Sequence, residues 1–190
     1  RISDKIIFNS VSQLKKFYPK VKDKIIGLRV NPLFSYSHFD LANPARRYCK
    51  LGTRDMDSVR DVLHMISGVM FHYNCENDDF KNFGSLLDRL GRDYGDILKK
   101  LDWVSLGGGF YFTKDGYPLE KFSLKLKSFS NKFDLQVYLE PGEAAVTQTV
   151  DLVTTVLDIV KNEMEVAVVD SSVEAHMLDL LIYRTEAKME

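Results

Sequence analysis

The sequence predicts an α/β protein built around a parallel β-sheet. Short runs rich in β-branched and aromatic residues alternate with longer segments that carry helix signals. The short runs are apolar almost without interruption, which is typical of strands buried on both faces and joined by helical crossovers. We therefore expect parallel strands covered by helices on both faces of the sheet.

Five strand-like runs and the segments between them follow one another along the first 140 residues. The runs are residues 5–9, 24–30, 68–73, 103–106 and 135–140. The predicted helix starts are Ser10 before residues 11–17, Asp57 or Ser58 before turns through 65, Asp78 or Asp79 before an amphipathic stretch through 101, and Pro118 before a helix through 133.

The pattern changes after Glu143. Residues 144–160 contain β-branched residues without helical spacing, and residues 165–170 again resemble a strand. The change predicts a domain boundary near residue 145. The chain begins at Arg1 and enters a strand almost at once, so we expect it to be a piece of something longer.

Composition and charge narrow the class of function. The 190 residues are 45% apolar and 12% aromatic, enough for a packed core. The 26 basic and 27 acidic residues are mixed along the chain, so no charged footprint favours nucleic acid or an anionic membrane surface. Cys49 and Cys75 are too few for a disulfide framework, and no apolar run approaches the roughly 20 residues that span a bilayer. We expect a cytoplasmic protein with neither a nucleic-acid nor a membrane partner.

Polar residues and glycines gather where the predicted strands end. Five parallel strands fit either a self-sufficient doubly wound sheet or an arc of an eight-stranded barrel, and the length leaves both open. In either architecture ligands bind at the carboxyl ends of the strands. The residues at these ends are Asn9, Asn31, His72, Gly107, Gly108, Gly109 and Glu140. One rim of the sheet is therefore the candidate site.

Three successive glycines follow the fourth run. Without Cβ atoms, Gly107, Gly108 and Gly109 allow backbone N–H groups to surround an anion, whereas one or two glycines would serve for a plain strand-to-helix turn. No Gly-Lys-Ser/Thr follows, and no G-x-G-x-x-G is present. The pattern favours a phosphorylated ligand smaller than a nucleotide or dinucleotide.

Glu140 ends the fifth run, and Pro141-Gly142 then forces a sharp turn. This turn should hold the Glu140 carboxylate at the rim with little rotational freedom. A lone strand-end glutamate is ordinarily only solvated, but a fixed carboxylate can keep a heteroaromatic nitrogen protonated. Beside the glycines, it suits a phosphorylated, electron-withdrawing cofactor.

His72 lies where an apolar strand turns abruptly polar. A single histidine at a strand end is more often structural, yet a flat imidazole at the shared rim can also stack on a flat cofactor. Cys75 and Glu76 beside it raise the alternative of a metal site. Because no paired ligand spacing repeats, we expect no metal.

Five ordered motifs resemble one enzyme family. They are Asn-Pro at 43–44 with RYCKLG at 47–52, FHYNCE at 71–76, WVSLGGG at 103–109, LEPGEA at 139–144 and DSSVEAHM at 170–177. In this order they resemble the carboxynorspermidine/carboxyspermidine decarboxylases. These enzymes are a polyamine-making branch of the alanine-racemase-fold decarboxylases that depend on pyridoxal 5'-phosphate (PLP).

The resemblance implies a fold and an activity. Residues 1–145 would be the C-terminal portion of a PLP-binding (β/α)8 barrel of the alanine racemase type, and residues 146–190 the beginning of a β-rich domain. The whole protein would be a homodimeric PLP-dependent carboxy-lyase acting on a small-molecule polyamine precursor in norspermidine or spermidine biosynthesis. Alternatives are a decarboxylase of another basic amino acid, such as diaminopimelate, ornithine or lysine, and a non-catalytic PLP-binding homologue.

The resemblance also implies roles for individual residues. The catalytic residues would be Glu140, as partner of the pyridine nitrogen, and His72, stacked on the ring. The cofactor would be held by His72, Gly107, Gly108, Gly109, Glu140 and Gly142, with the phosphate on the three-glycine turn. The amino groups of a long cationic substrate would face Glu143, Glu174, His176 and Asp179, for which plain surface polarity is an equal alternative.

Departures from the family pattern are also visible. The family's cofactor-linking lysine lies on an early barrel strand that precedes the matched region, so no lysine here takes that role and the 190 residues alone should be inactive. Lys50, Phe110 and Leu178 replace the usual Arg, His and Pro, and Glu143 stands where many related decarboxylases carry Arg. Since Lys cannot reproduce a bidentate Arg contact, phosphate or substrate handling should differ.

Overall fold

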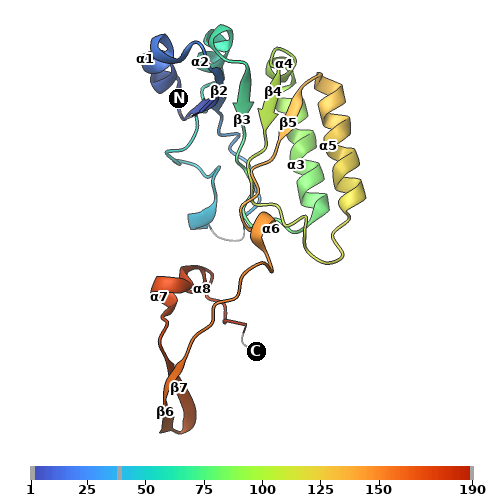
Figure 1. Ribbon diagram of the computed structural model, residues 1–190. Helices are drawn as coiled ribbons and strands as arrows, with labels where there is room; N and C mark the ends of the chain where they lie inside the picture. Colours follow the sequence, from blue (N-terminus) through green and yellow to red (C-terminus); the bar gives the residue numbers. More distant parts are fainter. Residues whose placement is uncertain (1–2, 38–39, 189–190) are drawn as a thin grey trace. The chain divides into compact units, whose positions relative to one another are not determined.

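The computed structural model describes residues 3–37 and 40–188 and separates the chain into two compact units, Arg1–Thr147 and Gln148–Glu190. The first unit contains a five-stranded parallel sheet and its helices, and the second contains a β-hairpin and two short helices (Figure 1). The candidate rim belongs to the first unit.

The strands of the first unit alternate with its helices. In chain order the elements are β1 (Lys5–Phe8), α1 (Val11–Val21), β2 (Ile25–Arg29), the 3₁₀ turn η1 (Asp40–Ala42), α2 (Met56–Asp61), η2 (Leu63–Met65), β3 (Gly68–Met70), α3 (Phe80–Asp93), α4 (Gly95–Leu98), β4 (Trp103–Ser105), α5 (Leu119–Phe133), β5 (Gln136–Tyr138) and α6 (Glu143–Val146). The strand order in the sheet is β1-β2-β3-β4-β5, and all four pairings are parallel.

All five predicted strands are confirmed, with shorter carboxyl ends than the apolar runs indicated. Residues 71–73 and 139–140 belong to the predicted runs but lie beyond the ends of β3 and β5. They lead into the loops of the rim, so hydropathy alone overestimated the strand lengths there.

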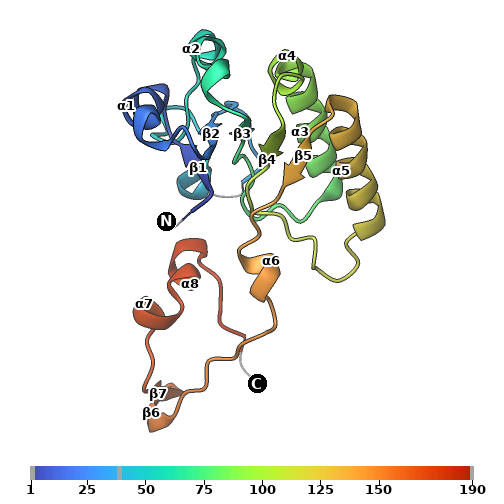
Figure 2. The same cartoon turned by 45° about the horizontal axis from the view of Figure 1, so that its top comes forward.

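One face of the sheet packs against the helices. Leu28, Val69 and Val104 lie side by side in register on this face and are fully buried in a core that includes Leu14 of α1 and Leu87 of α3. In Figures 1 and 2, α1 and α2 lie near the β1–β2 end of the sheet, and α3 and α5 lie side by side near the β4–β5 end. One-sided helical cover is the layout of a barrel segment.

The opposite face of the sheet corrects the expectation of helices on both sides. There the indole of Trp103 covers two neighbouring strands, because a Cβ at Gly68 or Gly27 would lie 2.1 or 2.4 Å from ring atoms of Trp103. The ammonium of Lys5 lies 4.1 Å from the centroid of Trp103 and 3.5 Å from that of Tyr138. Aromatic and cationic side chains therefore fill part of this face of the sheet.

Helix starts follow the capping signals in most places. The Ser10 hydroxyl accepts a hydrogen bond from Gln13 N, and the Asp79 carboxylate accepts one from Lys81 N, as predicted. The prediction of Asp57 or Ser58 as a helix start was wrong. Asp55 caps α2, and its carboxylate accepts from the N–H groups of both of those residues.

Helix ends differ more from the sequence prediction. α1 continues past residue 17 to Val21 with Pro19 inside it. The amphipathic stretch that begins at Phe80 is interrupted at Tyr94, which separates α3 from α4. α5 follows Pro118 and ends at Phe133, as predicted, where Asp134 adopts a left-handed conformation with φ 53°.

The second unit consists of β6 (Val156–Asn162) and β7 (Met164–Val169), which pair antiparallel, followed by α7 (Val173–His176) and α8 (Leu178–Tyr183). Asp170 fastens the open end of the hairpin, since its carboxylate accepts hydrogen bonds from Thr154 Oγ1 and Thr155 N. The short helix α6 was not foreseen in residues 144–160. Among the described residues, no helix combines the length and apolar character needed to cross a bilayer.

Candidate active site

Two turns meet at the carboxyl ends of β4 and β5. The N–H of Glu140 donates to the carbonyl of Gly107 at 2.8 Å, so the chain after β5 is fastened to the glycine turn after β4. A Cβ at Gly108 would lie 2.4 Å from the carbonyl oxygen of Glu140 and 3.9 Å from the nitrogen of Gly142. Any side chain at Gly108 would push the two turns apart, so the close approach requires glycine.

The glycine turn presents backbone donors. Gly107 and Gly109 have φ +69° and +80°, a conformation that side chains rarely adopt. The N–H groups of Gly108 and Gly109 have no hydrogen-bond acceptor among residues 3–37 and 40–188. Gly108 is buried, so its N–H needs an acceptor from outside the chain, such as a ligand or a water molecule. This arrangement suits an anionic group.

The Glu140 carboxylate is fixed by the strand next to it. Oγ of Ser105, the last residue of β4, donates to Oε1 of Glu140 at 2.6 Å, and the N–H of Gly107 donates to the same Oγ at 3.2 Å. The carboxylate, the hydroxyl and the glycine turn form one connected set of hydrogen bonds.

The imidazole of His72 packs against the glycine turn. A Cβ at Gly107 would lie 2.4 Å from Nδ1 of His72. Burial lowers the pKa of His72 below its ordinary value, the positive charge of Arg29 lowers it further, and Glu140 opposes both effects. Nδ1 is buried and has no partner among the described residues. The ring is therefore a neutral, flat surface at neutral pH.

Arg29 is a rim residue that the sequence analysis missed. It is the last residue of β2, and its charge acts on both His72 and Glu140. Burial lowers the pKa of Arg29, while Cys49 and Glu140 act in the opposite direction, and its buried Nη2 has no partner among the residues described. A cation that ends an otherwise apolar strand was the available signal.

Glu143 is hydrogen-bonded to Tyr111, a second residue near the glycine turn that the sequence analysis missed. Oη of Tyr111 donates to Oε2 of Glu143 at 2.7 Å. Burial raises the pKa of Tyr111, as do its hydrogen bond to Glu143 and the nearby charges of Glu143, Glu76 and Cys75. Two carboxylates therefore act on one phenol beside the glycine turn.

The other predicted substrate residues belong to the second unit. Glu174 and His176 lie in α7 and Asp179 lies in α8, and all three are solvent-exposed. Nδ1 of His176 lies 3.2 Å from both the backbone nitrogen and the carbonyl oxygen of Ser172, which caps α7. Their assignment to a substrate stays a prediction.

The asparagines at the strand ends make local contacts. Nδ2 of Asn9 donates to the carbonyl of Lys50 at 3.0 Å, and its Oδ1 accepts from Gly52 N at 2.9 Å, which fastens the loop that carries Lys50. Oδ1 of Asn31 accepts from Leu33 N within its own turn. Phe110, which follows the glycines, is 3% exposed and packs edge-to-face on Phe83.

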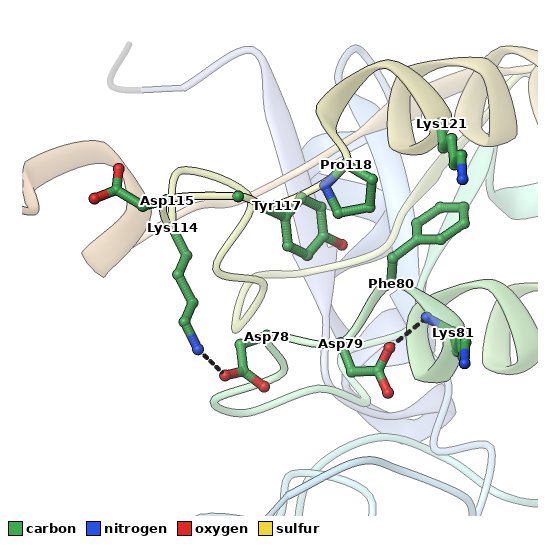
Figure 3. Close-up of a pocket in the computed structure, with 10 residues that line it drawn as sticks. Asp78, Asp79, Phe80, Lys81, Lys114, Asp115, Tyr117, Pro118 and Lys121 are labelled. Atoms are coloured by element: carbon green, nitrogen blue, oxygen red, sulfur yellow. Dashed lines mark hydrogen bonds and ion pairs between the residues drawn. The ribbon is translucent and has the colours of Figure 1, made fainter.

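One cavity of the first unit shares no lining residue with this rim. It has a volume of about 540 Å³ and is shown in Figure 3. Its walls are Asp78, Asp79, Phe80, Lys81, Lys114, Asp115, Gly116, Tyr117, Pro118 and Lys121. Lys114 pairs with Asp78, and burial together with Asp79 and Asp78 raises the pKa of Tyr117 to about 12. Within the described part of the chain, no three His, Cys, Asp or Glu side chains gather as metal ligands would.

Comparisons with known proteins show which enzymes this chain is similar to. No family model matches the sequence. The carboxynorspermidine/carboxyspermidine decarboxylase of Herminiimonas arsenicoxydans is 50% identical over 187 residues, which are 98% of this chain and 51% of that protein. The enzyme of the same name from Campylobacter jejuni is 41% identical over 181 residues, covering 95% of this chain and 47% of that protein.

Solved structures give the same result. Carboxynorspermidine decarboxylase from Campylobacter jejuni, complexed with norspermidine, superposes with a TM-score of 0.83 at 37% identity and covers 98% of this chain and 48% of that one. Diaminopimelate decarboxylase from Helicobacter pylori shares the fold. It superposes with a TM-score of 0.77 at 18% identity and covers 96% of this chain and 50% of that one. An SrLDC mutant solved in complex with PLP also shares the fold. Its TM-score is 0.65 at 17% identity, and the match covers 95% of this chain and 49% of that one.

The fold is that of the PLP-dependent decarboxylases of the alanine racemase type, so the predicted barrel portion followed by the start of a β-rich domain is confirmed. Within this class the sequence resemblance is also confirmed. The chain is homologous to the carboxynorspermidine/carboxyspermidine decarboxylases over nearly all of its residues, and it spans about half the length of the curated relatives it matches.

Proposed function

We propose that the whole protein carrying this chain is a PLP-dependent carboxy-lyase that decarboxylates carboxynorspermidine or carboxyspermidine. The observation that carries the proposal is the meeting of the glycine turn, the Glu140 carboxylate and the His72 ring at one rim. The homology to decarboxylases of these substrates supports it. A homodimer in the cytoplasm, implied by the same resemblance, belongs to this proposal.

The residues present fit PLP. The unpaired N–H groups of Gly108 and Gly109 suit its phosphate, and Gly142 leaves open space beside them, with nothing within 4 Å of a Cβ built there. The neutral ring of His72 suits stacking on a flat pyridine. When bound, PLP supplies an electron sink that accepts the electron pair left behind as CO2 departs.

The residues of this chain supply orientation and proton control. Glu140, held by Ser105, would keep a proton at the ring nitrogen while negative charge develops. His72 would pack against one face of the pyridine ring. Arg29 places a positive charge close to the Glu140 carboxylate, so the two opposite charges attract each other at the rim.

The substrate class follows from the acidic residues beside the glycine turn. Glu143 is held by Tyr111, and the Glu76 carboxylate acts on the same phenol. This pair of carboxylates attracts the ammonium groups of a polyamine precursor and repels a second carboxylate on a substrate such as diaminopimelate. The arrangement therefore favours the polyamine precursors over diaminopimelate, which carries a second carboxylate. Glu174, His176 and Asp179 are proposed to bind the remote amino groups.

The experiment uses the purified whole protein. We expect absorbance from bound PLP and CO2 release from carboxynorspermidine or carboxyspermidine at rates well above those from diaminopimelate, ornithine or lysine. Equal or faster release from one of these three would replace the proposed substrate with another basic amino acid. Cofactor binding without CO2 release from any of them would favour a non-catalytic homologue.

A further inference from the structure

Ser105 lies between the glycine turn and the Glu140 carboxylate and is hydrogen-bonded to both. It is the last residue of β4 and is 1% exposed. It lies on the same sheet face as Trp103, two residues further toward the rim. A serine is unusual in a fully buried strand, so its hydroxyl needs partners.

Both hydrogen-bonding capacities of this hydroxyl are in use. Its single proton goes to Oε1 of Glu140 at 2.6 Å, a length typical of a hydroxyl bound to a carboxylate. Its oxygen accepts the N–H of Gly107 at 3.2 Å. Because each partner comes from a different turn, the hydroxyl can satisfy both only in one rotamer.

We propose that Ser105 is a positioning residue for the Glu140 carboxylate, a role that rests on the proposed function. Glu140 is then held at two points, through its backbone N–H on the carbonyl of Gly107 and through Oε1 on Ser105. Oε2 has no hydrogen-bond partner among the described residues and remains available for the nitrogen of a pyridine ring. Ser105 also ties the carboxylate to the glycine turn, so one hydroxyl sets the spacing between the two ends of the cofactor site.

Three substitutions of Ser105 separate this role from simple packing. Ser105→Ala removes the hydroxyl, and Ser105→Cys keeps nearly the same volume with a much weaker donor. Ser105→Thr retains the hydroxyl and adds a methyl group. Ser67→Ala is the matched control, because the Ser67 hydroxyl also lies against the sheet, where it accepts from Nε1 of Trp103 at 3.0 Å, away from Glu140.

The test measures the whole protein with bound PLP. In the Ala and Cys variants we expect kcat to fall about tenfold or more, the loss expected when a hydrogen bond to a charged group is removed, while KM stays near that of the wild type. We also expect the pH at which the absorption spectrum of bound PLP changes to move downward, because the ring nitrogen loses its fixed anion. Thr should restore most of the rate, and Ser67→Ala should change the melting temperature without changing the spectrum.

The outcomes are distinct. If the wild type binds PLP and releases CO2 but the Ala and Cys variants keep its spectrum and kcat, the positioning role is wrong and the proposed function stands. If Thr is as impaired as Ala, the effect is one of packing and the role is again wrong. If the Ser105→Ala variant fails to fold, the Ser105→Cys variant alone tests the positioning role. A wild type that neither binds PLP nor releases CO2 would refute the proposed function, and this inference with it.

Discussion

The imidazole of His72 occupies the space where a side chain at Gly107 would lie. A Cβ at Gly107 would be 2.4 Å from Nδ1 and 2.9 Å from Cγ of His72, and its backbone has φ +69°. The ring and the glycine turn are therefore fitted to each other, so the absence of a side chain at Gly107 sets the position of His72.

Gly107→Ala should weaken PLP binding in the whole protein, because the new methyl group displaces either the His72 ring or the glycine turn. Gly116→Ala is the matched control, since Gly116 has a similar φ of +75° but nothing within 4 Å of its Cβ position. The control should lose only about 1–2 kcal/mol of unfolding free energy from backbone strain. Equilibrium dialysis with PLP measures the binding, and unchanged retention by Gly107→Ala would show that the fit is not needed.

The Trp103 ring predicts a second glycine effect, on stability. Gly68→Ala should destabilise the protein by roughly 1–3 kcal/mol or more, because a Cβ there would lie 2.1 Å from two atoms of the indole. Gly84→Ala in α3 is the control. Its Cβ would meet only the end of the Lys125 side chain at 3.9 Å, so alanine should stabilise the helix by about 0.5–1 kcal/mol. Urea unfolding of both variants gives the comparison, and equal effects would contradict the packing of Trp103.

The sheet shows how far the sequence could predict the fold. β-Branched and aromatic runs identified all five strands, because buried parallel strands need such residues along their whole length. The same runs wrongly indicated helices on both faces. Gly27, Gly68 and Trp103 are as apolar as core residues, but they pack on one another on the face opposite the helices. Hydropathy does not distinguish an aromatic filling from a helical layer.

The sequence also predicted some residues of the rim and missed others. His72, the glycine turn and Glu140 were predicted because each stands at the end of an apolar run, where a change of residue type is visible. Arg29, Ser105 and Tyr111 were missed as site residues. Arg29 and Ser105 lie inside the predicted strand runs, and Tyr111 follows Phe110 as a second aromatic residue. A place in a strand or in the core is enough to account for each of them, so none stands out in the sequence. The glutamates that act on them are 32 to 111 residues away in sequence, and only the fold brings them together.

The lowered pKa of His72 predicts a pH dependence of stability. Its ordinary pKa is 6.5, and burial with the Arg29 charge lowers it in the folded state, against the opposing charge of Glu140. Between the lowered pKa and 6.5 the unfolded chain binds the proton that the folded chain excludes. Stability therefore rises with pH in this window and is lost as the pH falls from 6.5 toward the lowered value. Unfolding free energies at several pH values should show this slope for the wild type.

His72→Gln should remove that part of the slope, because glutamine does not titrate. The measurement is the difference between wild type and variant at each pH rather than either curve alone, since carboxylates also titrate as the pH falls. A difference that stays constant across the window would mean that His72 titrates equally in the folded and unfolded states.

The hydrogen bond between Tyr111 and Glu143 predicts an effect on substrate binding. Tyr111→Phe removes the donor that holds Oε2 of Glu143 at 2.7 Å, so the carboxylate loses its fixed orientation. We expect KM for carboxynorspermidine to rise by about 2- to 10-fold, the equivalent of one ordinary hydrogen bond, with kcat little changed. Glu143→Gln should raise KM further because it removes the charge. Steady-state kinetics of both variants tests this, and an unchanged KM in both would exclude Glu143 from substrate binding.

Glu140→Gln should separate cofactor binding from turnover. Glutamine fills the same space and can still accept the hydrogen bond of Ser105, so the two turns should stay joined and PLP should remain bound. It carries no negative charge, however, and cannot hold a proton on the ring nitrogen. We expect kcat to fall roughly 100-fold or more, the size of effect seen when a group that stabilises developing charge is removed. Equilibrium dialysis gives the PLP retention and CO2 release gives the rate. Near-normal turnover would show that another group controls the ring proton. Arg29 would then be the first residue to substitute, because its charge already acts on the same carboxylate.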